Sequence, residues 1–148
     1  MAKRGPGLIV IGENINTTRR IKANSPNIVK EDNKVGYVYN DLDGARRILD
    51  ITDIYPTDPA KVATARIGHI GQAVRKKDLH FLKWAILAQE RAGSHIIDLC
   101  VDELSVYPEE RREFMRWMVK TAQSLSDVSF AIDSSDPETI KAGLEVYD

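Results

Sequence analysis

The chain has 148 residues, of which 43% are hydrophobic and 29% charged, and its formal net charge is −1 at pH 7. This composition is typical of a globular domain with a real apolar core. The near-neutral balance argues against a polyanion-binding surface, so nucleic acid is not an expected partner. We recognise neither a signal peptide nor an apolar stretch approaching the roughly 18 residues of a membrane helix, which predicts a cytoplasmic protein that does not bind membranes.

The first expected strand is Leu8–Ile11, an apolar run ended by Gly12 and followed by a polar loop. A buried strand that leads into a polar loop is typical of the carboxyl end of a parallel strand. The polar loop residues are Glu13, Asn14, Asn16 and Thr17. The pattern alone leaves two interpretations open, because such residues either contact ligands or form turns.

Residues 20–67 give the weakest pattern. Val35–Tyr39 is expected to form a short strand or a packed loop, and Asp41–Ile54 has apolar residues at helical spacing, so we predict a helix there. Tyr55-Pro56 would end that helix. A connection this long inside a domain is usually functional or disordered, and its apolar residues argue against full disorder.

The remaining chain alternates helices and strands. The predicted helices are 73–92, one that begins at Pro108, and one capped by Ser135 or Asp136; the predicted strands are 95–101 and 128–133. Repeated strand–helix units predict an α/β fold with a parallel sheet.

Polar side chains capable of chemistry gather at the ends of the three expected strands. These residues are Glu13 and Asn16, then Asp98, Cys100 and Asp102, then Asp133, Ser134 and Ser135. In parallel α/β folds, ligands bind at the carboxyl ends of the strands. Helix capping explains Ser135 and Asp136 but not Asp98 and Asp133, which interrupt apolar runs, so we predict a polar cavity there.

No spacing of histidine and cysteine resembles a metal site, and no catalytic residue is identified. Cys100 is expected to be a small buried residue, with a reactive thiol as the alternative. Ser134 has no histidine at readable spacing to act as its base. His95 begins the second strand, away from the predicted cavity, and is expected to be structural.

Three segments carry a resemblance to a known family. They are L-I-V-I-G-E-N-I-N-T-T, A-G-S-H-I-I-D-L-C-V-D-E and F-A-I-D-S-S-D-P-E-T-I-K-A-G-L. In this order they resemble the pterin-binding family of methyltetrahydrofolate methyltransferases, which includes corrinoid-dependent methyltransferases and the folate module of cobalamin-dependent methionine synthase. The resemblance covers residues 8–19 and about 71–148. Dihydropteroate synthases share the fold but differ in the second motif, and they form an alternative.

The resemblance implies a (β/α)8 TIM barrel, of which residues 1–148 form the amino-terminal part with strands one to three. Residues 20–67 are then an insertion in the first connection between strand and helix. It implies that Asp133 binds the pterin, assisted by Asp98, Glu13 and Asn16, with Ser134, Cys100 and Asp102 nearby. Cys100 stands where the family usually has an asparagine, and a thiol cannot replace an amide's paired donor and acceptor.

The implied substrate is methyltetrahydrofolate or tetrahydrofolate, and the implied cofactor is a corrinoid (cobalamin) on a partner protein. The family continues through five further strands, so we expect either a fragment or half of a split barrel completed by a second chain or by a homodimer. The predicted activity moves a methyl group between N5 of tetrahydrofolate and cobalt, in either direction. The alternative from another class is a non-catalytic pterin-binding or assembly subunit.

Overall fold

The computed structural model describes residues 7–148. Its strands are β1 (Ile11–Asn16), β2 (Ile21–Lys22), β3 (Ile28–Glu31), β4 (Lys34–Asn40), β5 (Arg46–Asp50), β6 (Arg66–Ile67), β7 (Ile96–Cys100) and β8 (Ser129–Asp133). Its helices are η1 (Thr52–Ile54), η2 (Pro59–Lys61), α1 (His69–Arg75), α2 (Leu79–Arg91), α3 (Pro108–Leu125) and α4 (Pro137–Leu144). Among these described elements, no helix is both long enough and apolar enough to cross a lipid bilayer.

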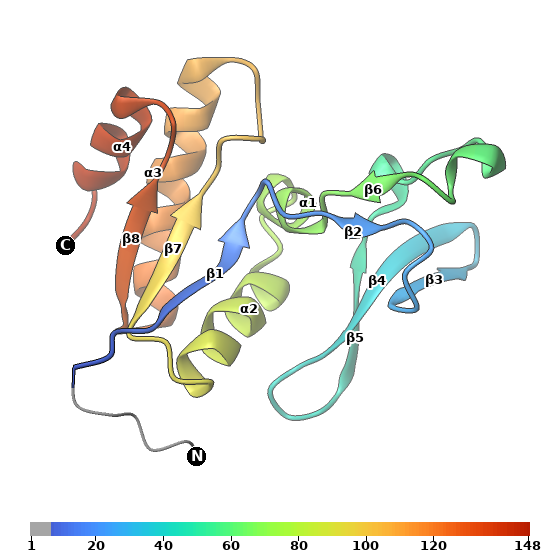
Figure 1. The fold of residues 1–148 in the computed structure, drawn as a ribbon, viewed down its shortest axis with the longest axis horizontal. Coiled ribbons are helices and arrows are strands. Elements are labelled where there is room, and N and C mark those ends of the chain that lie inside the picture. The colour runs from blue at the N-terminus through green and yellow to red at the C-terminus, as the bar shows by residue number, and fades with distance from the viewer. Residues whose placement is uncertain (1–6) are drawn as a thin grey trace.

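The central element is a three-stranded sheet in the order β1-β7-β8, and both of its strand pairs are parallel. The predicted parallel arrangement of these three strands is therefore confirmed. The strands lie side by side in Figure 1, with the β2–β6 region at the opposite end of the molecule. Within residues 7–148, no strand pairs with the outer edge of β1 or of β8.

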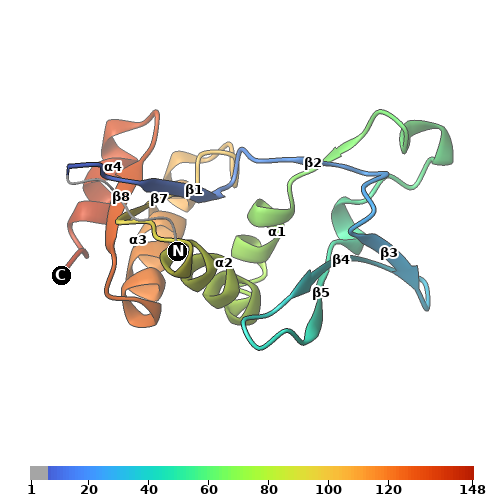
Figure 2. The same ribbon diagram turned by 60° about the horizontal axis from the view of Figure 1, so that its bottom comes forward.

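One face of this sheet is covered by helices. Ile97 and Leu99 are fully buried on this face, and Phe130 is the register partner of Ile97 in β8. A Cβ atom at Gly143 of α4 would lie 2.9 Å from side-chain atoms of both Ile132 and Met115, so α4, β8 and α3 pack closely there. Figure 2 shows α2 and α3 beneath the sheet. The opposite face has no covering layer among the described elements.

The first strand differs from its prediction. β1 begins at Ile11, whereas Leu8 and Ile9 are exposed by more than 60%. Gly12 does not end the strand. Gln89 of α2 lies very close to the Gly12 backbone. A Cβ atom added at Gly12 would be only 2.4 Å from Oε1 of Gln89. The residues predicted to follow the strand, including Glu13 and Asn16, are therefore inside it.

The helix predicted for Asp41–Ile54 is wrong. Strands β4 and β5 pair antiparallel across this region and form a second sheet with β3. The Asp41 side chain accepts hydrogen bonds from the backbone N–H groups of Asp43 and Ala45, and Gly44 has a φ of +83°, so the chain turns instead of continuing a helix. Val35–Tyr39 lies within β4, which confirms the strand alternative.

The single helix predicted for residues 73–92 is two helices. The helical conformation is interrupted at Lys77, whose φ is +50°. Asp78 then caps the second helix, α2, by accepting a hydrogen bond from Phe81 N–H. Leu79 belongs to the predicted apolar stripe but is 54% exposed, because it lies at the start of the new helix. The predicted stop at Gly93, with a φ of +101°, is confirmed.

The segment between β1 and α1 shares its core with the rest of the molecule. Leu49 and Ile51 are fully buried in the same apolar cluster as Phe81 of α2. On the surface, Lys76 pairs with Asp50 at 3.4 Å and with Asp53 at 3.1 Å. Residues 20–67 are thus a folded β region packed against α1 and α2.

Candidate functional site

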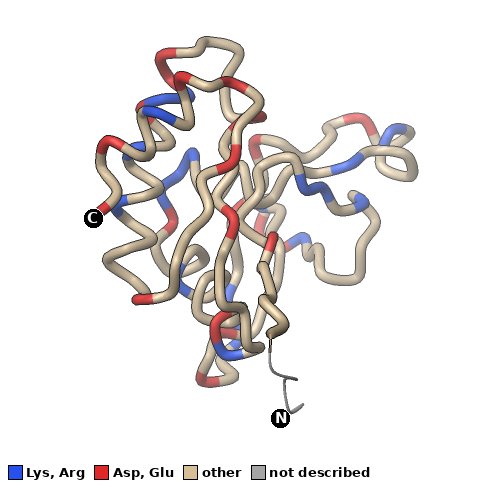
Figure 3. Tube along the Cα trace, turned by 60° about the vertical axis from the view of Figure 1, so that its left-hand side comes forward, with Lys and Arg blue, Asp and Glu red and all other residues tan. Residues whose placement is uncertain are grey.

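The open face of the parallel sheet carries the polar residues at the carboxyl ends of its strands. Cys100 is the register partner of both Asn16 in β1 and Asp133 in β8, and Asp98 is the partner of Ala131. Partners in neighbouring parallel strands point to the same face. Figure 3 shows acidic positions on neighbouring strands of the sheet. The structure therefore brings together the predicted residues of all three strands.

An irregularity in β1 places Glu13 in this group. Gly12 pairs with Ile97 and Ile15 with Leu99, so three steps along β1 match two along β7. The extra residue is a β-bulge, a feature that redirects side chains. Without the bulge, regular alternation would point Glu13 and Ile15 to the same face. Instead Ile15 is 1% exposed in the core, and the charge of Glu13 acts on Asp98.

The pKa of the Asp98 carboxyl group is strongly perturbed on this face. Burial raises the pKa of its carboxyl group to about 6, and the negative charges of Asp133 and Glu13 add to the increase. Each of these effects disfavours the ionised form. Asp98 therefore gains or loses its proton close to neutral pH. Three carboxyl groups that converge on one open face form a site suited to a ligand with several N–H donors.

Asp102 links the loops that follow β7 and β8. Its carboxylate accepts hydrogen bonds from the hydroxyl groups of Ser134 and Ser135, and also from Ser135 N–H at 2.7 Å. Burial opposes ionisation of Asp102, but these hydrogen bonds outweigh it and lower the pKa of the carboxyl group. Ser135 therefore does not cap α4. Asp136 does, by accepting hydrogen bonds from Glu138 N–H and the Thr139 hydroxyl. Asp102 and Ser134 were predicted to contact a ligand, and that remains a prediction. In the structure, the hydrogen bond between them joins the two loops.

Cys100 is a buried thiol, with 3% of its surface exposed. Burial raises the pKa of the thiol to about 11, and the nearby carboxylates of Asp102, Asp133 and Asp98 raise it further, against one backbone hydrogen bond from Asp102. A thiol with this pKa is protonated at neutral pH and is a poor nucleophile. These properties favour the interpretation of Cys100 as a small buried residue.

Asn16 takes part in a turn, and its amide also faces the site. The side-chain oxygen accepts hydrogen bonds from Thr18 N–H at 2.9 Å and from the Thr18 hydroxyl at 2.7 Å. This arrangement is an Asx turn. The oxygen is therefore occupied, and the N–H donors of the amide are the part of Asn16 that can meet a ligand. The two interpretations of this loop are compatible at Asn16.

Arg19 is a site neighbour that the sequence reasoning did not single out. Its Nη1 donates to the backbone oxygen of Glu13 at 3.0 Å and to Asn14 Oδ1 at 2.8 Å, so it holds the bulge of β1. The only signal in the sequence was a pair of arginines after the first motif. His95 has a structural role at the far end, because its Nδ1 accepts a hydrogen bond from Val10 N–H.

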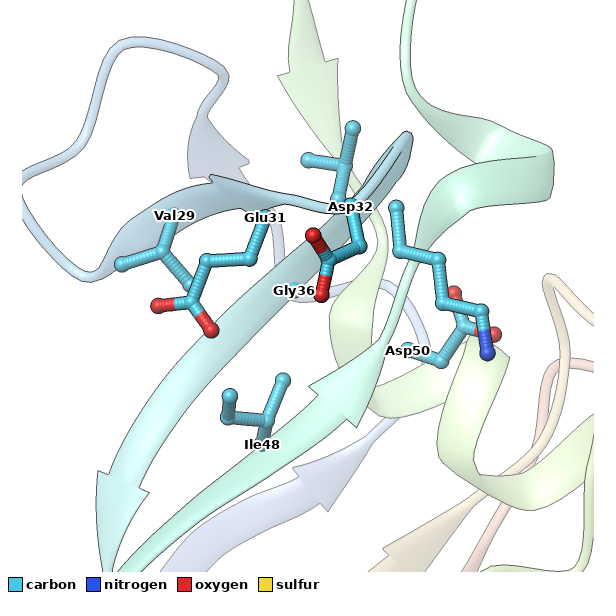
Figure 4. A pocket seen from close by; sticks show the side chains of 8 residues that line it. Val29, Glu31, Asp32, Gly36, Ile48 and Asp50 are labelled. Atoms are coloured by element: carbon cyan, nitrogen blue, oxygen red, sulfur yellow. The ribbon is translucent and has the colours of Figure 1, made fainter.

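Another hollow, of about 240 Å³, lies on the β3–β4–β5 sheet (Figure 4). Two of its three carboxylates are paired: Glu31 contacts Arg46 at 2.9 Å, and Asp50 contacts Lys76. Among residues 7–148, no three histidine, cysteine or acidic side chains are grouped as metal ligands would be. We therefore place the candidate site on the open face of the parallel sheet.

A comparison with curated proteins finds one informative relative. Over 73 residues, the chain is 34% identical to the methylcorrinoid:tetrahydrofolate methyltransferase of Eubacterium limosum. The match covers 49% of this chain and 26% of that protein, so the chain matches about a quarter of its relative's length. No protein-family model matches the chain. This partial similarity supports a relationship to methyltransferases of this kind.

Proposed function

We propose that this chain contributes part of the pterin pocket of a methyltransferase. The reaction moves a methyl group between N5 of tetrahydrofolate and the cobalt of a corrinoid held by a partner protein. The observation that carries this proposal is the convergence of Glu13, Asp98 and Asp133 on the open face of the sheet. The partial similarity to a methylcorrinoid:tetrahydrofolate methyltransferase supports it.

The carboxylates match the donors of a reduced pterin. A pterin presents an amino group and ring N–H groups along one edge, and a carboxylate accepts two such hydrogen bonds side by side. Asp133 is exposed at the end of β8, so it is accessible to a ligand and forms the proposed anchor. The other polar groups of the proposed pocket are Glu13, Asp98 and the Asn16 amide. Cys100 and the Asp102–Ser134 pair lie next to them.

The role of the protein in such a transfer is to position and polarise the pterin. A corrinoid, when bound to its partner, supplies the cobalt centre that gives or takes the methyl group. The amine at N5 leaves more readily when it is protonated or hydrogen-bonded. Asp98, whose pKa is about 6, is the group on this face that exchanges a proton near neutral pH. Glu13 and Asp133 tune that exchange through their charges.

We also propose that β1, β7 and β8 are three consecutive strands of a (β/α)8 barrel. The parallel order and the helices on a single face support this architecture. Further strand–helix units, on the same polypeptide or on a second chain, would pair with the outer edges of β1 and β8. Closing the barrel would place the acidic face inside its mouth, where TIM-barrel enzymes bind their substrates.

Calorimetry with 5-methyltetrahydrofolate tests the pterin site. We expect weak, saturable binding to the chain and a loss of at least about tenfold in affinity for Asp133→Asn, because one charged acceptor is removed. The matched control is Asp43→Asn, an exposed aspartate in the turn between β4 and β5. Binding that is tight and unchanged in Asp133→Asn would contradict the assignment of Asp133 as the anchor.

A further inference from the structure

An open groove of about 830 Å³ lies on the outer side of α3, beside the link between α1 and α2, and we call it the α3 groove. It belongs to the layer of helices and not to the face of the sheet that carries the candidate site. The lining residues used below are Lys77, Glu110, Glu113, Phe114, Trp117 and Lys120. Lys77 comes from the link, and the other five come from α3.

The α3 groove would stay open in a closed barrel. Helix α3 packs between α2 on one side and α4 on the other, as Figure 2 shows. Both of its neighbours in the layer of helices are therefore already present in this chain. Strand–helix units added beyond β1 or β8 would cover the outer sides of α2 and α4 instead. The proposed closure of the barrel therefore leaves this groove exposed.

Two aromatic side chains form the apolar part of the groove. Phe114 and Trp117 are three residues apart on α3, so they are neighbours on one face of the helix. Both are only partly buried, which leaves part of each ring open to another molecule. The ammonium group of Lys77 lies 5.4 Å from the centre of the Trp117 ring. Aromatic side chains beside charged groups are typical of protein–protein interfaces.

The charged residues that α3 contributes to the groove are separated by sign along the helix. Glu110 and Glu113 lie toward its N-terminal end, and Lys120 lies toward its C-terminal end, with the aromatic pair between them. Glu113 is paired with Arg116 at 2.6 Å. Among residues 7–148, neither Glu110 nor Lys120 has an ion-pair partner. Each end of the groove therefore keeps a charge that can pair with another molecule.

This order of charges is complementary to itself. When two α3 helices pack antiparallel about a twofold axis, the acidic end of each copy meets the basic end of the other. Glu110 lies four residues before Phe114, and Lys120 lies three residues after Trp117. If Phe114 of one copy meets Trp117 of the other, Glu110 and Lys120 of opposite copies differ in height by about 1.5 Å, the rise of one residue. A partner with a single sign of charge would be repelled at one end.

We propose that the α3 groove binds the same groove of a second copy of this chain and forms a twofold-symmetric dimer. Phe114 and Trp117 of both copies fill its centre, and the contacts between Glu110 and Lys120 fix the antiparallel orientation. The dimer uses the helix-covered side of the sheet, so it leaves the outer edges of β1 and β8 free. It therefore differs from a dimer that completes the barrel, and it does not depend on the pterin site.

Sedimentation equilibrium over a range of concentrations tests the dimer. All chains carry Ile9→Lys, which suppresses association through the edge of β1. Glu110→Lys should weaken self-association by at least about tenfold, because two pairs of lysines then meet in each dimer. Lys120→Glu should have the same effect, because two pairs of glutamates then meet. The matched control is Lys83→Glu, the same charge change at an exposed position of α2, which should leave the dissociation constant unchanged.

A mixture of Glu110→Lys and Lys120→Glu chains distinguishes this interface from any other. In the mixed dimer both contacts pair a lysine with a glutamate, so we expect association within about threefold of the chain without either substitution. Mixing would not correct a structural defect in either variant, nor association through a different surface.

Three results overturn the proposal: a chain that stays monomeric at every soluble concentration, unchanged association in both variants, or no recovery in the mixture. The first of these would leave the groove to a different partner. If either charge variant does not fold, Trp117→Ala provides a second test, because it removes a ring from the centre of the interface. Unchanged association of Trp117→Ala also overturns the proposal.

Discussion

The two faces of the β1–β7–β8 sheet differ in both chemistry and packing. On the covered face, Ile97 and Leu99 are fully buried beneath helices. On the open face, the same strand presents Asp98 and Cys100. Side chains on one face of this alternating strand thus stabilise the fold, whereas the other face carries Asp98, which is available for binding, beside the buried Cys100. The difference predicts that substitutions one residue apart will affect different properties.

The largest expected effect is on the covered face. Leu99→Ala should lower the free energy of unfolding by about 3 kcal/mol, because it removes buried methyl groups and leaves a cavity. Ile96→Ala, on the open face of the same strand, should lower it by less than about 1 kcal/mol. Urea denaturation measures both. Equal losses in the two variants would show that the open face is also packed.

The Asp102 link between the loops should have an intermediate effect. Asp102→Asn should lower the free energy of unfolding by about 1.5 kcal/mol, because the carboxylate accepts three hydrogen bonds from Ser134 and Ser135. Thermal denaturation measures the change. Asp133→Asn serves as the control, since that carboxylate is exposed, and it should change stability by less than about 0.5 kcal/mol. A stability loss in Asp133→Asn that matches Asp102→Asn would contradict this division of roles.

The smallest effect depends on pH and reports on Asp98. Between about pH 4 and pH 6, the folded chain keeps a proton on Asp98 that the unfolded chain has lost, so stability falls as the pH rises through this window. Asp98→Asn removes that loss. The variant should match the native chain near pH 4 and exceed it by about 1 kcal/mol at pH 7, after allowance for solvent screening of a partly exposed group.

Chemical denaturation at several pH values measures this difference, with the exposed Asp43→Asn as the control. A gap between Asp98→Asn and the native chain that does not change with pH would show that Asp98 has its ordinary pKa.

The sequence pattern predicted the regions where one local signal dominates. The alternation of 95–101 predicted β7 and its two faces, and Pro137 with a preceding aspartate predicted the start of α4. The helix predicted for residues 41–54 was wrong because their apolar spacing fits a helix, whereas the turn at Gly44 depends on hydrogen bonds to the Asp41 side chain. The break before Asp78 was missed because its capping signal lay inside a long apolar pattern.

The sequence predicted most of the residues of the candidate site but not how they are arranged. Strand ends alone placed Asp98 and Asp133 together, because neighbouring parallel strands end at the same edge. The position of Glu13 depends on a bulge next to Gly12, where Gln89 of the distant helix α2 comes close to β1.

The apolar segment Leu8–Ile11 has a consequence for handling the protein. It contains neither charge nor proline and leads into the unpaired edge of β1, with 36% to 65% of each residue exposed. An edge of this kind is a template for strand addition by another molecule. The isolated chain should therefore aggregate with increasing concentration, and a lysine in place of Ile9 should delay that aggregation in light-scattering measurements.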